Sequence, residues 1–190
     1  LCKDKAITKK ILGFDGIRVP SFMRIDIHTK ANFDQIGFPA IVKPLNREAS
    51  EGIAQASVVY EKKSCIERVQ FIHERLSSAA IIEEFIHGRE LYVGVIEMDH
   101  RPVALPPREL FMKHLKDDQA MVATFQAKWN DDYRKRWGVN TSKAGPMSRS
   151  TLEKLMSNSV HIFQSLGMRG YARIDWRMTK EGEPVFLEAN

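Results

Sequence analysis

Cysteine is scarce in this sequence, and long apolar runs are missing. Its 190 residues include two cysteines, Cys2 and Cys65, and their wide separation gives neither a metal-binding nor a redox spacing. Such usage is typical of the reducing cytoplasm. No apolar run is long enough to cross a membrane, and no secretory signal opens the chain. We therefore expect a cytoplasmic protein without a membrane partner.

The motifs of several enzyme classes are also absent. The six histidines show no HExxH spacing, no serine lies in a nucleophile elbow, and neither cysteine has a catalytic helper nearby. The net charge of +5 suits either a solvated surface or attraction of an anion, such as a nucleotide phosphate or a nucleic acid backbone. Aromatic residues beside Arg134 to Arg136 could stack on bases, but no RNA-binding motif surrounds them. Nucleic acid is therefore not the favoured partner.

Hydrophobic periodicity predicts an α+β protein, because strands alternate with helices and hairpins. Caps predict helices that begin at Asp4, at Ser64 with Glu67, and at Ser150 with Glu153. Strands are predicted at residues 38–44, 56–59, 79–82, 90–98 and 103–105, and in a hairpin that closes the chain. From 115 to 147 the pattern fades, which predicts a long loop that is either functional or disordered.

The closing stretch GYARIDWRMTKEGEPVFLEAN, residues 170–190, predicts two strands around the turn Lys180 to Glu183. Because side chains alternate along a strand, Asp175 shares a face with Arg173, and Glu188 shares a face with Asn190. The alternate positions predict one apolar core face: Ala172, Ile174, Trp176, Val185, Leu187 and Ala189. With a four-residue turn, Asp175 lies opposite Glu188, where like charges are destabilising.

A divalent cation would compensate that repulsion. Asp175, Glu188 and Asn190 offer hard oxygen ligands, which suit Mg²⁺ or Mn²⁺. Two carboxylates and an amide leave positions for water and phosphate oxygens, as at magnesium sites beside nucleotides. Arg173 is a candidate for clamping an anion held by the metal. The alternative is an exposed strand face with scattered charges.

Lys43 and the loop after it are candidate phosphate contacts. Lys43 ends the apolar strand AIVKP and could meet a phosphate as a point charge, or simply reach solvent from the strand end. The loop LNREASEG contains the small residues Ala49 and Ser50, so its backbone N–H groups could cover phosphates.

The segment IIEEFIHGRE is a candidate adenine-binding hinge. Its apolar strand leaves through Phe85 and Ile86 toward Glu90. The backbone there could contact an adenine edge while Glu90 accepts hydrogen bonds from ribose hydroxyls. An ordinary connection between strands is the alternative.

Five segments together resemble a known family: DKAITKKIL, FPAIVKPLNREASEG, IIEEFIHGREL, FQAKW, and GYARIDW followed by VFLEAN. They are similar, in order and spacing, to the ATP-grasp superfamily, most closely its D-alanine:D-alanine ligase branch. The resemblance implies an ATP-grasp fold in which two α+β subdomains grip a nucleotide. Residues 4–88 would form the small (lid) subdomain, and 89–190 the large one, with a mobile loop near 115–147 and a truncated C-terminus.

The resemblance also implies roles for single residues. Contacts to ATP, from the phosphates through the covering loop and adenine hinge to the ribose, are implied for Lys5, Lys43, Ala49, Ser50, Glu83, Phe85, Ile86 and Glu90. Lys128 in FQAKW matches a mobile-loop lysine that reaches the terminal phosphate, and Arg173 matches the arginine at the reacting centre. Asp175, Glu188 and Asn190 match the ligands of two magnesium ions.

The implied activity is an ATP- and Mg²⁺-dependent ligation that joins a carboxylate to an amine through an acylphosphate. The family's N-terminal domain and the loop beyond its last strand are absent from this sequence, and Ala49 stands where D-alanine ligases usually carry serine. We therefore expect a core that binds ATP but is incomplete for catalysis. A ligase for another amino acid or peptide, a non-catalytic nucleotide-binding module, and an RNA-binding domain around residues 134–137 are the alternatives.

Overall fold

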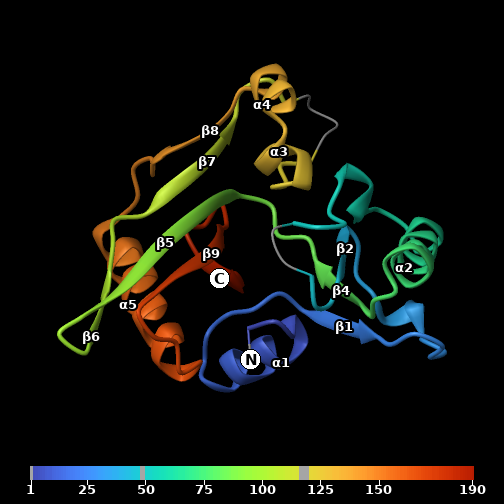
Figure 1. Cartoon of the computed structure of the whole chain (residues 1–190), viewed down its shortest axis with the longest axis horizontal. Helices are drawn as coiled ribbons and strands as arrows, with labels where there is room; N and C mark the ends of the chain where they lie inside the picture. The colour runs from blue at the N-terminus through green and yellow to red at the C-terminus, as the bar shows by residue number, and fades with distance from the viewer. Residues whose placement is uncertain (1, 48–49, 116–119) are drawn as a thin grey trace.

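The computed structural model describes residues 2–47, 50–115 and 120–190, and its strands form two antiparallel sheets (Figure 1). The first sheet has the strand order β1-β4-β2-β3, and the second has β10-β9-β5-β7-β8 with β6 paired to β5. The strands of the first sheet are β1 Phe22–Ile25, β2 Ala40–Pro44, β3 Val58–Val59 and β4 Ala80–Glu84. Those of the second are β5 Arg89–Met98, β6 Arg101–Ala104, β7 Arg108–Met112, β8 Val139–Lys143, β9 Tyr171–Met178 and β10 Pro184–Ala189.

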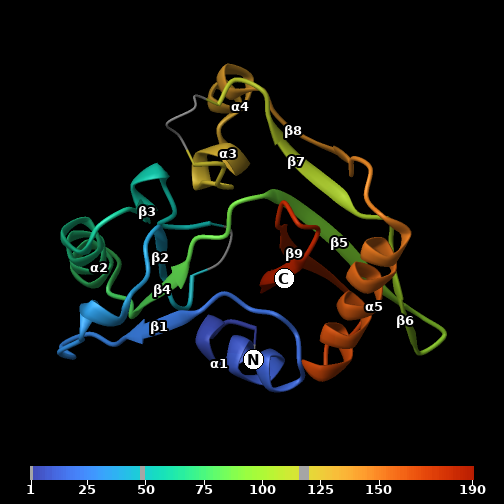
Figure 2. The same ribbon diagram turned by 180° about the vertical axis from the view of Figure 1, so that it is seen from behind.

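Helices cover one face of each sheet. The helices are α1 Lys5–Phe14, α2 Lys62–Leu76, α3 Phe125–Trp129, α4 Asp131–Trp137 and α5 Arg149–Ser165, with single 3₁₀ turns η1 Phe33–Gln35 and η2 Gln55–Ser57. α2 lies on the first sheet, α5 packs on the second, and α1 runs between the two sheets (Figures 1 and 2). Among the described residues, no helix combines the length and apolarity needed to cross a membrane.

Strand alternation leaves the opposite face of each sheet for polar groups. In β2, Ala40 and Val42 pack under α2, whereas Ile41 and Lys43 point to the other side. In β9, Ile174 packs into the core with α1 and α5. The neighbouring position, Asp175, lines a cleft instead. The predicted division between the apolar and polar faces of β9 is therefore confirmed.

Two helix starts differ from the sequence prediction. α2 begins at Lys62, and the Ser64 hydroxyl donates to the carbonyl of Glu61 (3.0 Å) from inside the first turn. α5 begins two residues earlier than predicted, because Ser148 and not Ser150 accepts the hydrogen bond from the Thr151 N–H (3.1 Å). Several polar residues precede each helix, and the N-cap is the one whose backbone is extended directly before the first helical residue.

The prediction that residues 115–147 form one long loop is wrong for the described part of that segment. Residues 120–147 contain α3, α4 and β8. Thr124 caps α3 by accepting from the Ala127 N–H, and Asn130 caps α4 by accepting from the Tyr133 N–H. These elements are short and half-exposed, so they lack the long apolar stripe that identifies a helix from sequence.

The closing hairpin has a β-bulge that simple alternation does not predict. Asp175 does pair with Glu188, as predicted, but Trp176 pairs with Phe186, so one extra residue, Leu187, lies between the pairs. The bulge turns Phe186 into the core, where its ring lies edge-on to Trp176. The prediction that Leu187 belongs to the core face is wrong, because it lines the cleft.

Candidate functional site

A cleft of about 570 Å³, counting its open mouth, lies between the polar faces of the two sheets. It brings together nine of the predicted residues: Lys43, Ser50, Glu83, Phe85, Ile86, Glu90, Lys128, Asp175 and Glu188. These residues come from both sheets, from α3, and from the connections that follow β2 and β4. Three others lie beside it: Lys5, Arg173 and Asn190. Ala49 lies outside the described residues.

One end of the cleft is apolar. Ile41, Phe85 and Val122 pack as one cluster, joined by the partly buried Ile53. Phe85 and Ile86 border the same space. An apolar slot of this kind suits a flat heteroaromatic ring, which stacks on apolar walls.

A buried carboxylate holds two lysines on the first sheet. Glu83, on β4, is 1% exposed, and its two oxygens lie 3.0 Å from Lys9 Nζ and 2.8 Å from Lys43 Nζ. Burial alone would raise the pKa of Glu83, but Lys43 and Lys9 lower it to about 2. Burial works to lower the pKa of Lys43, and the Glu83 carboxylate outweighs it. The side chain of Glu83 therefore keeps Lys43 charged in the cleft.

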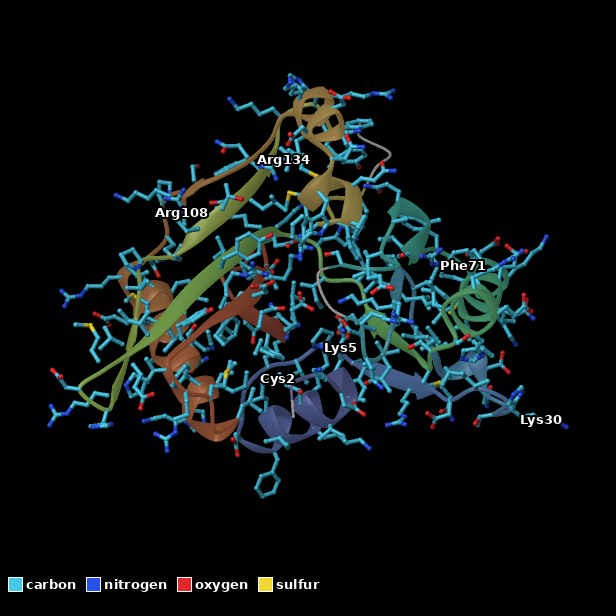
Figure 3. All side chains as sticks on the ribbon, viewed as in Figure 1. Cys2, Lys5, Lys30, Phe71, Arg108 and Arg134 are labelled. Carbon is cyan, nitrogen blue, oxygen red and sulfur yellow. The ribbon has the colours of Figure 1, made fainter. Side chains whose placement is uncertain are left out.

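Lys5 adds a cation at the start of α1, where Figure 3 labels it near the middle of the molecule. Its Nζ donates to the carbonyls of Leu45 (3.4 Å) and Arg47 (2.5 Å), at the beginning of the loop after β2. Burial lowers the pKa of Lys5, and the nearby Glu188 carboxylate opposes that effect. Lys5 is thus tied to the loop predicted to cover phosphates.

Glu188 sits among cations. Burial would raise the pKa of this carboxyl, but Lys43, Lys128 and Lys5 together lower it. These lysines come from β2, α3 and α1, so segments far apart in sequence create one field. A cluster of cations around carboxylates is a suitable environment for a polyphosphate with a divalent ion.

Asp175 is buried and bound by Arg173. The Arg173 guanidinium donates to both of its oxygens (2.7 and 2.8 Å), and the Asn190 amide donates to Oδ2 (3.3 Å). Burial raises the pKa of Asp175 to about 7, against the lowering effect of Arg173 and with the support of the Glu188 charge. Arg173 also lies 4.9 Å from the centre of the Tyr92 ring. The three polar groups predicted on the hairpin therefore do converge with Arg173.

Glu90 is held by a second buried ion pair. Its Oε2 accepts from Arg177 (3.0 Å) and its Oε1 accepts from the Tyr92 hydroxyl (2.8 Å). Arg177 also donates to the carbonyls of Gly88 and Met121, both at 3.2 Å. These contacts fix Glu90 at the cleft wall. Through Arg177, they also connect β9 to Gly88 in the segment before β5 and to Met121 before α3.

Sequence reasoning missed Lys9, Tyr92 and Arg177. Lys9 follows Lys5 by four residues, so both lie on one face of α1, and that face is the buried one. Arg177 continues the alternation of Arg173 and Asp175 on β9. Periodicity could therefore have found two of the three residues, whereas Tyr92 carries no distinguishing signal.

No metal-binding cluster of three or more His, Cys, Asp or Glu side chains occurs in the described ranges. The hairpin contributes two carboxylates, Asp175 and Glu188, with the amide of Asn190 next to them. This set suits a hard ion that takes its other ligands from water and phosphate, and it does not suit a closed protein cage.

Two antiparallel sheets with a charged cleft between them give the chain the ATP-grasp fold. More particularly, the chain belongs to the family described as the D-ala D-ala ligase C-terminus, whose family model matches residues 12–190.

Named relatives agree with this assignment. The chain is 27% identical to the D-alanine–D-alanine ligase of Bacillus anthracis over all of its length and 57% of the relative's. It is 30% identical to the D-alanine–D-alanine ligase of Aquifex aeolicus, over 98% of its length and 57% of the relative's. The crystal structure of the B. anthracis ligase complexed with ATP has the same fold, with a TM-score of 0.74 at 24% identity, covering 100% of this chain and 54% of that one. The chain thus spans about half the length of the curated relatives it matches.

Proposed function

We propose that this chain is the nucleotide-binding core of a carboxylate–amine ligase that uses ATP and Mg²⁺. The observation that carries the proposal is the cleft between the sheets, where an apolar slot leads to lysines and paired carboxylates. The relatives named as D-alanine–D-alanine ligases support the reaction class. We also propose that residues 4–88 act as the small subdomain and 89–190 as the large one, with a mobile loop near 115–147 that excludes water from the site.

The nucleotide would lie with its adenine in the apolar slot beside Phe85 and Ile86. Glu90, fixed by Arg177 and Tyr92, would accept hydrogen bonds from the ribose. Lys43 and Lys128, with Lys5 behind them, would neutralise the triphosphate as point charges. Ser50 and Ala49 belong to the loop that would cover it.

Asp175, Glu188 and Asn190 would hold the magnesium ions, which supply positive charge beside the transferring phosphoryl group. In the reaction, a substrate carboxylate oxygen attacks the γ-phosphorus of ATP, ADP leaves, and an acylphosphate forms. An amine then attacks the acyl carbon, loses a proton, and phosphate leaves. The residues of the cleft position the groups and stabilise charge.

Arg173 would stabilise the oxyanion at the acyl carbon. It lines a second cavity next to the cleft with Arg134 and the aromatic residues Tyr92 and Trp129, and Lys128 borders both spaces. Cations at this position favour a carboxylate substrate. D-Alanine, another amino acid and a peptide all carry that group.

Calorimetry with ATP and Mg²⁺ tests nucleotide binding directly. We expect the unaltered chain to bind, and the double variant Asp175→Ala/Glu188→Ala to lose binding. Glu67→Ala/Glu74→Ala is the matched control, because these exposed carboxylates lie on α2. Equal binding by both double variants would contradict the proposed metal ligands.

Release of ADP by the full-length gene product, measured with a panel of amino acids, tests ligation and identifies the substrate. Nucleotide binding without amino-acid-dependent ADP release would favour a non-catalytic module. Salt-sensitive RNA binding that ATP does not alter would favour the RNA-binding alternative.

A further inference from the structure

Lys9 is a buried cation whose contacts reach both sheets. Its side chain is 1% exposed, and its Nζ lies 3.0 Å from Glu83 Oε1 on β4. The same ammonium donates to the carbonyl of Leu187 on β10 (2.7 Å), 178 residues away in sequence. It also lies 5.5 Å from the centre of the Phe186 ring. Removing an ammonium from water costs free energy. The contacts of Lys9 with Glu83, Leu187 and Phe186 offset that cost.

The Leu187 carbonyl belongs to the β-bulge of the closing hairpin. The strand register shifts between Phe186 and Glu188, and Leu187 takes no partner in the β9–β10 pairing. Lys9 supplies a hydrogen-bond donor at this interruption. The donor therefore acts on the backbone immediately before Glu188, a carboxylate that lines the cleft together with Lys43 and Lys128.

On its other side, Lys9 acts on Lys43 through one carboxylate. Glu83 binds Lys9 with one oxygen and Lys43 with the other. Without Lys9, the Glu83 carboxylate would be drawn entirely to Lys43, and the charge of Lys43 available to a ligand would fall. Lys9 thus contacts Glu83, the partner of Lys43 on the first sheet. It also contacts the carbonyl of Leu187, which directly precedes Glu188 on the second sheet.

We propose that Lys9 is a positioning residue that sets the placement of Lys43 and Glu188 across the cleft, and so the affinity for a nucleotide with its metal ion. It does not itself line the cleft. This inference rests on the proposed function, because it concerns the same ligand.

The test compares Lys9→Met with Lys10→Met, which makes the same change at the next, exposed position of α1. Affinity for Mg·ATP is measured by calorimetry, and folding by circular dichroism. We expect Lys9→Met to weaken binding by about 10- to 100-fold, the range for residues that orient metal ligands. Lys10→Met should bind like the unaltered chain.

A double-mutant cycle with Glu188→Gln separates positioning from general damage. If Lys9 acts by placing Glu188, the loss of Mg·ATP affinity in Lys9→Met/Glu188→Gln should be smaller than the product of the losses in the two single variants. Losses that multiply fully, or a Lys9→Met affinity within about threefold of the unaltered chain, would overturn the inference and leave the proposed function standing. Absence of Mg·ATP binding by the unaltered chain would overturn both.

A second pair of variants covers the case in which Lys9→Met does not fold. Lys9→Met/Glu83→Gln removes both members of the Lys9–Glu83 pair, so neither is left buried without the other. Lys43 loses its Glu83 partner in this variant and in Glu83→Gln alike, so the comparison isolates Lys9. It is compared with Glu83→Gln alone. A further loss of about tenfold or more in the double variant supports positioning through Leu187, and equal affinities overturn it.

Discussion

Truncation of Phe186 tests the bulge that shapes the end of β10. If side chains alternated without interruption, Leu187 would belong to the core and Phe186 would face the cleft. The structure has the opposite arrangement. Phe186 is fully buried and lies 6.1 Å from Trp176 between ring centres, whereas Leu187 is partly exposed at the cleft wall.

The two positions should differ clearly in their contribution to stability. Phe186→Ala is expected to lower the free energy of unfolding by about 3–5 kcal/mol, as for phenylalanine in other cores. The edge-on pair with Trp176 contributes roughly 0.5–1.5 kcal/mol of this loss. Leu187→Ala removes a side chain that is only partly shielded, so we expect a loss of about 1–2 kcal/mol.

Urea denaturation followed by tryptophan fluorescence and circular dichroism gives both values, provided that the slope against urea stays unchanged among the variants. Phe14→Ala is the control, since Phe14 is 93% exposed and its loss should change stability by less than about 0.5 kcal/mol. If Leu187→Ala costs as much as Phe186→Ala or more, the bulge and the position of Glu188 that follows from it are refuted.

Three further predictions concern single groups. The pKa of Glu83 is lowered to about 2 from its usual 4.5, so its ion pairs stabilise the fold above about pH 4.5 and lose up to about 3 kcal/mol as the pH falls toward 2. In Glu83→Gln, the free energy of unfolding should depend less on pH over that window. Ser148→Ala should cost about 1 kcal/mol in thermal unfolding, and Ser150→Ala less than about 0.5 kcal/mol, whereas the reverse order would contradict the observed cap. Cys65 is fully buried, and burial raises its pKa to about 11, so a thiol reagent should label it only after unfolding, in contrast to Cys2; rapid labelling of both thiols in the folded chain would be inconsistent with this burial.

Long, strongly periodic elements could be predicted from the sequence because local patterns determine them. β2, β4 and β5 appear close to their predicted positions, and Asp4 caps α1 as predicted. The short helices α3 and α4 could not be predicted, since their stability comes from packing on β7 and β8 around Leu110 and Val139. Contacts of that kind depend on strands that are distant in sequence.

The Asp175–Glu188 pairing was predicted correctly even though two of its premises differ from the structure. The turn is one residue longer than assumed, because Met178 pairs with Pro184. The bulge at Leu187 then shifts the register by one residue in the opposite sense, and the two differences cancel at Asp175. A side chain count along a hairpin therefore identifies partners only where turn length and bulges are both known.

The polar network of the cleft depends on a level of structure that the sequence pattern does not contain. Glu83 could be placed in a hinge segment, but its side chain turns out to join Lys43 of β2 to Lys9 of α1. These three residues become neighbours only when α1 lies against the open face of the first sheet and the end of β10 closes over it. A buried carboxylate with two cations is stable only with both partners in place, so substitution of any one of the three should affect the other two. We therefore expect Lys9, which lies outside the cleft, to influence Lys43 and Glu188 within it.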